Sequence, residues 1–132
     1  IVGVFNGCFY TDPTTSKPTF SNYWPGNAAT DAVAFIYDSP MDVFEIQADA
    51  AFPVADLFGN FDIVDNTGTG STASGISYVE LDVSTGATTA TLPIKALDIS
   101  GDPENSDVST ANTNVLVTIQ NHLFGQKQVG LA

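Results

Sequence analysis

The apolar residues of this chain come in short runs, and nearly every run is rich in β-branched or aromatic side chains and bounded by Gly, Pro, Asn or Asp. Such runs are typical of β-strands, whereas an amphipathic helix would repeat its apolar residues every three or four positions. The spacing of roughly ten residues suits a small sandwich or barrel. The predicted strands cover residues 1–10, 19–24, 32–37, 43–48, 61–64, 76–83, 90–97 and 113–120. The sequence therefore predicts an all-β fold, a single small antiparallel β-barrel or sandwich of seven to eight strands.

Turn residues predict how neighbouring strands connect. Residues 12–16 contain Asp, Pro and Ser and should close a hairpin, and residues 38–42 form a second turn-like loop. Residues 85–87 should separate two later strands. The only helical signal is 52–59, where Pro53 suits a first turn and Gly59 is expected to end it in a left-handed conformation.

The length of 132 residues suits one domain, predicted to span 1–132. The chain opens on Ile1 inside a predicted strand and has no initiator Met, so we expect a native N-terminal segment to precede it. Residues 1–10 would place apolar side chains on both faces of a strand, which predicts a central strand or one covered on both sides.

Charge excludes several classes of function. Fifteen carboxylates stand against three Lys and no Arg, which gives a net charge of −12. Nucleic-acid binding needs clustered Lys and Arg, and an anionic membrane surface attracts basic segments, so neither partner is expected. With one His, no Arg and few Lys, the chain also lacks the usual means of acid–base and electrostatic catalysis. We expect no enzymatic activity and no cofactor.

The remaining reactive residues support structural interpretations. Cys8 is the only cysteine and lies in an apolar run, so we expect a buried, unreactive thiol. His122 follows the last predicted strand and is expected to be hydrogen-bonded there. Residues 68–70 resemble part of a phosphate loop, but no Lys follows, so we interpret them as hairpin residues.

Acidic residues give two weak candidate sites. Asp98, Asp102, Glu104 and Asp107 could supply oxygen ligands to Ca²⁺, although their spacing differs from that of the helix–loop–helix calcium loop. We expect a solvated connecting loop there and no bound metal. Glu45 or Glu80 could act as a catalytic carboxylate of a small glycosidase-like enzyme, but the sequence places no two Glu residues at a suitable separation.

Aromatic residues cluster in the first predicted hairpin: Tyr10, Phe20, Tyr23 and Trp24. Exposed aromatic rings can anchor a protein interface or stack on sugars, and buried ones fill a core. The sequence leaves both alternatives open.

The amino-acid sequence of several segments resembles that of small β structural proteins of tailed phages that decorate or cement the capsid. The resemblance rests on residues 2–12 (VGVFNGCFYTD), 20–26 (FSNYWPG), 32–40 (AVAFIYDSP), 44–49 (FEIQAD), 54–62 (VADLFGNFD) and Asn121-His122. It spans most of the chain. It departs at Ala73-Ser74-Gly75, where such proteins often have Arg-Ser.

This resemblance implies a virion structural protein on the capsid exterior, with the major capsid protein and further copies of itself as partners. The expected interface residues are Phe20, Tyr23 and Trp24 in the aromatic hairpin, and Asp38, Pro40 and Met41 in the following loop. Two alternatives remain open: a carbohydrate-binding β-sandwich module that uses Tyr23 and Trp24, and a minor tail or fibre component.

Overall fold

A computed structural model describes residues 1–65, 70–125 and 130. These residues form eight strands and one 3₁₀ turn, which confirms the all-β prediction and its strand number. The strands are β1 (Val4–Thr11), β2 (Pro18–Ser21), β3 (Val33–Tyr37), β4 (Val43–Gln47), β5 (Asn60–Asp65), β6 (Val79–Ala87), β7 (Ile94–Ile99) and β8 (Asn114–Ile119), with the 3₁₀ turn η1 (Val54–Asp56) between β4 and β5.

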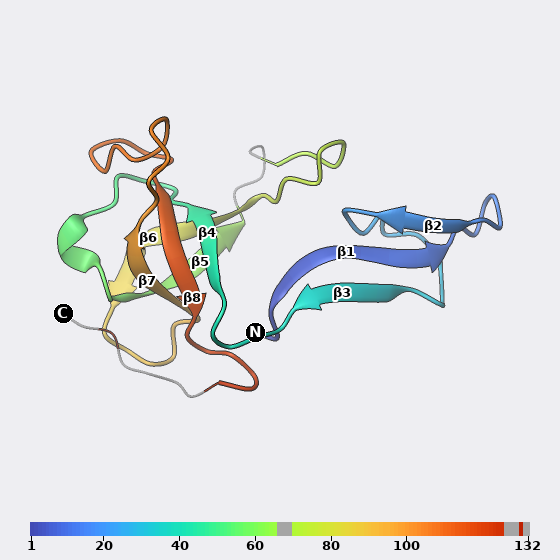
Figure 1. The fold of residues 1–132 in the computed structure, drawn as a ribbon, viewed down its shortest axis with the longest axis horizontal. Coiled ribbons are helices and arrows are strands. Elements are labelled where there is room, and N and C mark those ends of the chain that lie inside the picture. The colour runs from blue at the N-terminus through green and yellow to red at the C-terminus, as the bar shows by residue number, and fades with distance from the viewer. Residues whose placement is uncertain (66–69, 126–129, 131–132) are drawn as a thin grey trace.

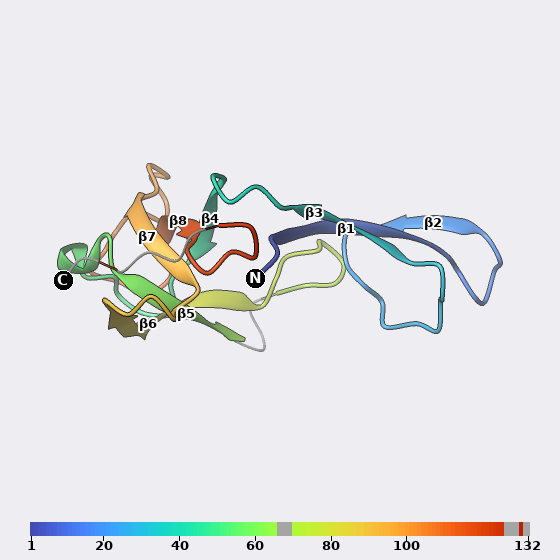
Figure 2. The same ribbon diagram turned by 90° about the horizontal axis from the view of Figure 1, so that it is seen from below.

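The strands form two antiparallel sheets. One has three strands in the order β2-β1-β3, and the other has five in the order β4-β8-β7-β5-β6. Figures 1 and 2 show the three-stranded sheet projecting away from the larger one, so that the molecule is elongated. We call residues 1–37 the arm and the described residues from 43 onward the body.

The arm is organised around β1, which is its central strand as predicted. The predicted hairpin with β2 is confirmed, and its turn is closed by bonds from the Asp12 N–H to the Lys17 carbonyl (2.9 Å) and from the Ser16 N–H to the Asp12 carbonyl (2.7 Å). The other side of β1 pairs with β3. The alternative prediction, that β1 is covered on both faces, is wrong for the first half of the strand, since Val4 and Phe5 are exposed.

The body is a curled sheet whose two outer strands approach each other at one end. An isolated bridge joins Ala48 to Leu81, and the Asp49 N–H donates to the Leu81 carbonyl (3.1 Å). Elsewhere β4 and β6 separate, so the sheet is open and sandwich-like rather than a closed barrel. Its inner side holds one apolar cluster: Ala48, Phe52, Phe61, Leu81, Ile94, Ala96, Val115, Val117 and Ile119.

Several predicted strand boundaries in the body are wrong, and β6 begins at Val79 rather than at residue 76. β6 continues through Gly86 to Ala87, where a turn was predicted, because Ala87 pairs with Asn60 of β5. β7 begins at Ile94 rather than near residue 90, and Ile94 pairs with both Phe61 and Ile119. Pairing with distant strands, not local turn propensity, fixes these boundaries.

The short helical element is confirmed as a 3₁₀ turn after Pro53, but its left-handed residue was predicted wrongly. Phe58 has the positive φ (66°), and Gly59 does not. Gly59 is needed for a different reason, because a Cβ at this position would lie 2.9 Å from the Asp56 carbonyl oxygen.

Candidate functional site: the apolar face of the arm

One face of the arm sheet is apolar and uncovered. The register places Phe9 opposite both Phe20 of β2 and Val33 of β3, and opposed residues of neighbouring strands share a face. Phe35 and Tyr37 follow Val33 at alternate positions, and Val4 is opposite Tyr37. We call this set the apolar face of the arm: Val4, Phe9, Phe20, Val33, Phe35 and Tyr37.

Aromatic contacts tie this face together across all three strands. The Phe9 and Phe20 rings are 4.8 Å apart, and the Phe20 and Phe35 rings are stacked 6.1 Å apart. Phe20 is nevertheless 74% exposed, and Val33, Phe35 and Tyr37 are exposed as well. The rings thus contact one another along the face but remain largely exposed to solvent. An exposed cluster of large apolar side chains is typical of a surface that another molecule covers.

The part of the opposite face around Cys8 and Tyr10 is covered by the connection between β2 and β3, which Figure 2 shows running beside the sheet, whereas Phe5 and Ile36 on the same face are exposed. The Trp24 ring stands edge-on to Tyr10 at 5.6 Å, and the Cys8 thiol donates to the Tyr23 carbonyl (3.5 Å). Tyr10 and Cys8 are buried, as predicted for Cys8. Burial, followed by the nearby Asp12 carboxylate, raises the pKa of Tyr10.

The predicted aromatic interface residues therefore do not form one surface. Phe20 lies on the apolar face, while Trp24 covers Tyr10 on the other face. Tyr23 and Trp24 each keep part of their surface exposed. The second half of the prediction falls on the connection between arm and body, where Met41 is 84% exposed, Asp38 is exposed and Pro40 is half-buried.

Sequence reasoning missed the contribution of β3. Val33, Phe35 and Tyr37 were assigned to a strand but not to an interface. The available signal was the run Val-Ala-Phe-Ile-Tyr, which is apolar at five successive positions and carries no charge.

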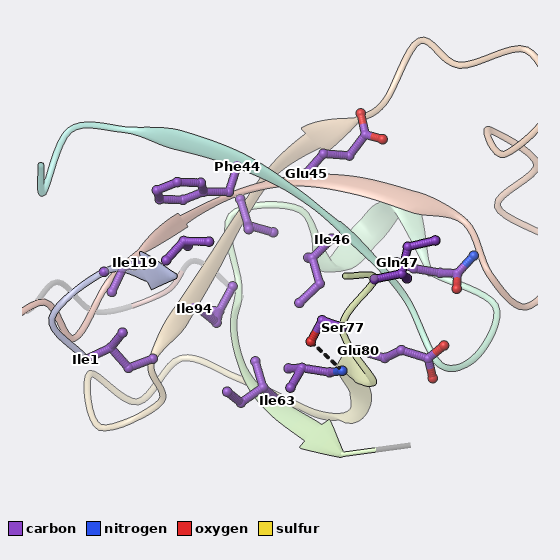
Figure 3. A pocket seen from close by; sticks show the side chains of 15 residues that line it. Ile1, Phe44, Glu45, Ile46, Gln47, Ile63, Ser77, Glu80, Ile94 and Ile119 are labelled. Atoms are coloured by element: carbon purple, nitrogen blue, oxygen red, sulfur yellow. Dashed lines mark hydrogen bonds between the residues drawn. The ribbon is translucent and has the colours of Figure 1, made fainter. Parts of the chain in front are cut away.

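A second apolar surface lies in the body. A groove of about 430 Å³ opens where β4 and β6 separate. Figure 3 shows Ile46, Ile63, Ile94 and Ile119 pointing into it from four strands, with Ile1 at one end. The Ile1 backbone nitrogen donates to the Asn121 carbonyl (2.9 Å), which ties the start of the arm to this end of the body.

The two candidate catalytic carboxylates border this groove but do not converge. Both oxygens of Glu45 accept hydrogen bonds, from the Ser100 hydroxyl (2.7 Å) and the Asn114 amide (2.8 Å). Glu80 is buried on the other outer strand. In Figure 3 the two carboxylates point in different directions, away from the isoleucines. A glycosidase needs two carboxyl groups that flank one bond, and this arrangement does not supply them.

The calcium candidates Asp98, Asp102, Glu104 and Asp107 are not gathered into a site. No group of three or more His, Cys, Asp or Glu residues that could hold a metal occurs in the described part of the chain. Asp102 accepts from the Glu104 N–H (3.0 Å), and Asp107 accepts from the hydroxyl (2.6 Å) and N–H of Ser109. The Ser109 bonds lower the pKa of Asp107. The carboxylates of Asp102 and Asp107 therefore act as turn-forming groups.

The other sequence candidates have structural roles or lie outside the described residues. His122 is buried, and its Nδ1 accepts from the Phe124 N–H (3.0 Å), as expected for a hydrogen-bonded residue after the last strand. Residues 68 and 69 of the Gly-Thr-Gly segment are not described. Among residues 1–65, 70–125 and 130, no helix has the length and apolar character to cross a membrane.

No protein-family model, curated protein or solved structure matches this chain. The candidate site therefore depends on its own geometry, and the surface that most needs a partner is the apolar face of the arm.

Proposed function

We propose that this protein is a non-catalytic virion component, a capsid decoration protein that binds the outer surface of an icosahedral phage head. There it would stabilise contacts between major capsid subunits. The observation that carries the proposal is the apolar face of the arm, whose three-stranded sheet projects from the body (Figure 1). The sequence resemblance to capsid decoration proteins supports the choice of partner.

The size of the apolar face suits one contact among many. An aromatic side chain presents about 150–250 Å². With their observed exposures, Phe20, Phe35 and Tyr37 together leave roughly 300–400 Å² uncovered, the size of a functional surface patch. A stable interface needs about 800 Å² from each partner, so one face alone gives modest affinity. Repetition over a symmetric shell makes modest contacts sufficient.

The charge distribution also supports docking through the arm, with the body away from the capsid. The arm contains only two of the 15 carboxylates, Asp12 and Asp31, together with Lys17. Burying a charge without a partner is costly. The apolar face has no charged residue, so docking it against a protein surface avoids this cost. The acidic body would then face solvent.

The carbohydrate-binding alternative has less support. The Trp24 ring packs against Tyr10, and Tyr23 and Trp24 are only 37% and 43% exposed, so neither ring is fully open for stacking on a sugar. A tail or fibre location would use the same arm, and it differs from the head location only in where the copies are found.

The test measures binding to phage heads. Recombinant protein is added to heads that have lost it, and bound copies are counted by quantitative mass spectrometry of sedimented particles. Phe20→Asp should lower binding about tenfold, because it places a charge in the apolar contact. Phe124→Asp is the matched control, since Phe124 is 67% exposed but lies on the body.

Saturable binding at a fixed copy number per head, lost in Phe20→Asp and retained in Phe124→Asp, supports the proposal. Absence of the protein from heads, or equal loss in both variants, overturns it. Copies found only on tails would move the site of action to the tail.

A further inference from the structure

The outer edge of β3 is unpaired. β3 pairs with β1 only, and all five of its residues are exposed. Within residues 1–65, 70–125 and 130, no hydrogen bond reaches the outer edge of this strand. A strand directs alternate N–H and C=O groups to each side, so this edge offers a row of donors and acceptors to another strand.

β3 also lacks the features that keep other edge strands apart. β2 begins with Pro18, β4 carries Glu45, and β6 carries Glu80 and Asp82. Charged residues and Pro on an edge are what prevent pairing between sheets. Between Val33 and Tyr37 β3 has neither, and the first charged residue beyond it is Asp38; its five residues include the β-favouring Val, Phe, Ile and Tyr.

The charge distribution favours a second copy as the occupant. Residues 38–132 carry 13 of the 15 carboxylates, so two bodies repel each other. The arm is nearly neutral and projects away from the body (Figures 1 and 2), so it is the part where two copies meet without that repulsion. A basic partner would find no complementary charge on β3.

Strand direction then selects the arrangement. β3 ends at Tyr37 next to the body, so a parallel pair would place two acidic bodies side by side, whereas an antiparallel pair places them at opposite ends. Five residues span about 17 Å, which exceeds the Debye length of about 8 Å at physiological ionic strength. Repulsion between the bodies is therefore largely screened in the antiparallel pair.

We propose that two copies of this protein associate by antiparallel pairing of their β3 strands across a two-fold axis at Phe35. The two arms then form one six-stranded sheet, with Phe35 opposite Phe35 of the second copy. A two-fold axis normal to the sheet keeps the apolar faces of both arms on the same side, which doubles the surface available for docking. The pairing goes beyond the proposed function, because it requires no phage head.

The first test is sedimentation equilibrium of the free protein without phage heads. The wild type should show a concentration-dependent monomer–dimer equilibrium. Phe35→Lys should weaken dimerisation about tenfold or more, because it opposes two like charges at the axis. Phe5→Lys is the matched control: Phe5 has nearly the same exposure (43% against 45%) but lies on the central strand and the other face of the arm. Circular dichroism checks that both variants are folded.

The second test is disulfide formation. Residues opposed across an antiparallel pair have Cα atoms about 4.5–5.5 Å apart, within disulfide range. Phe35→Cys should form a covalent dimer under mild oxidation much faster than Phe5→Cys. The native Cys8 is 2% exposed, so it gives little background. Phe20→Cys reports on face-to-face packing of the arms.

Faster cross-linking through residue 35, together with loss of the dimer in Phe35→Lys alone, supports the proposal. A wild type that stays monomeric at all concentrations overturns it. Equal weakening by Phe5→Lys, or cross-linking through residue 20 but not residue 35, overturns the edge pairing. These results do not depend on whether the protein binds heads.

Discussion

Gly7 is the residue on which the geometry of the arm depends most directly. It lies in the bulge of β1 between Phe5 and Cys8 and has φ of 111°. A Cβ there would lie 2.9 Å from the Ser21 carbonyl oxygen of β2. Both the backbone conformation and the close approach of the neighbouring strand therefore require glycine.

We predict that Gly7→Ala lowers the free energy of unfolding by about 1–3 kcal/mol, the usual cost of a strained backbone position. Two other glycines separate the causes. Gly26 has φ of 67° and open space around it, so Gly26→Ala should cost about 1 kcal/mol. Gly101 has neither constraint, so Gly101→Ala should be neutral or slightly stabilising. Chemical denaturation of the three variants checks this order, and equal effects at all three positions would contradict it.

At position 58 glycine should give a more stable protein than alanine, the reverse of the usual order. Its φ of 66° is a conformation that glycine adopts without strain and alanine does not. Phe58→Gly and Phe58→Ala both remove the ring, so their difference isolates the backbone. We expect the glycine variant to be more stable by about 1 kcal/mol in thermal unfolding. At the next residue glycine is again preferred, but for a steric reason: Gly59→Ala should destabilise, because its Cβ would lie 2.9 Å from the Asp56 carbonyl oxygen.

At the scale of elements, Asp31 ties the loop before β3 to the end of β1. Its carboxylate accepts from the Thr11 N–H at 3.1 and 3.2 Å. Bonds from the Thr11 side chain and backbone hold the pKa of Asp31 below its usual value of 3.8. The pKa is lower in the folded state, so this contribution to stability is present above about pH 4 and is lost as the pH falls through the folded pKa.

Asp31→Asn should therefore remove part of the acid sensitivity of the arm. The wild type should lose stability between about pH 4 and pH 2 to a greater extent than the variant, whose side chain does not titrate. Thermal midpoints of both proteins over this range measure the difference. Parallel pH profiles would show that the Thr11 contact contributes nothing to folding.

The sequence was sufficient to place the eight strands, because alternation and turn residues are local signals. It was not sufficient to assign them to sheets. The loop 38–42 resembles a hairpin connection, yet β3 and β4 belong to different sheets. Only long-range pairing decides this: β3 pairs with β1, and β4 with β8.

The candidate interface was predictable only in part, because the sequence shows which residues are aromatic but not which face of the sheet they occupy. Phe20 is predicted as an interface residue because it is an aromatic residue of the first hairpin, and it does lie on the apolar face. Trp24 met the same criterion and lies on the other side, because the chain after β2 turns back over Tyr10. Which face a residue occupies depends on register, and register depends on strands far apart in the sequence.

At the scale of the whole molecule, stability is unevenly distributed. All nine residues of the buried apolar cluster belong to the body. The arm buries only Cys8 and Tyr10 among its apolar side chains. We expect amide hydrogens of β1 to β3 to exchange faster than those of β7 and β8, since regions with few buried contacts open first. Exchange measured by mass spectrometry at low and high protein concentration should show β3 gaining protection as copies pair, with β7 unchanged.

Ionic strength distinguishes the antiparallel pair from a parallel one. At about 0.01 M salt the Debye length is about 30 Å, longer than the roughly 17 Å of paired strand between the bodies, so repulsion should weaken the antiparallel dimer. At about 0.1 M it falls to about 10 Å, and the dissociation constant should become nearly independent of salt. In a parallel pair the acidic bodies would be adjacent, and their repulsion would persist until the Debye length reached about 3 Å near 1 M. A dissociation constant that levels off near 0.1 M supports the antiparallel arrangement, and one that keeps falling toward 1 M contradicts it.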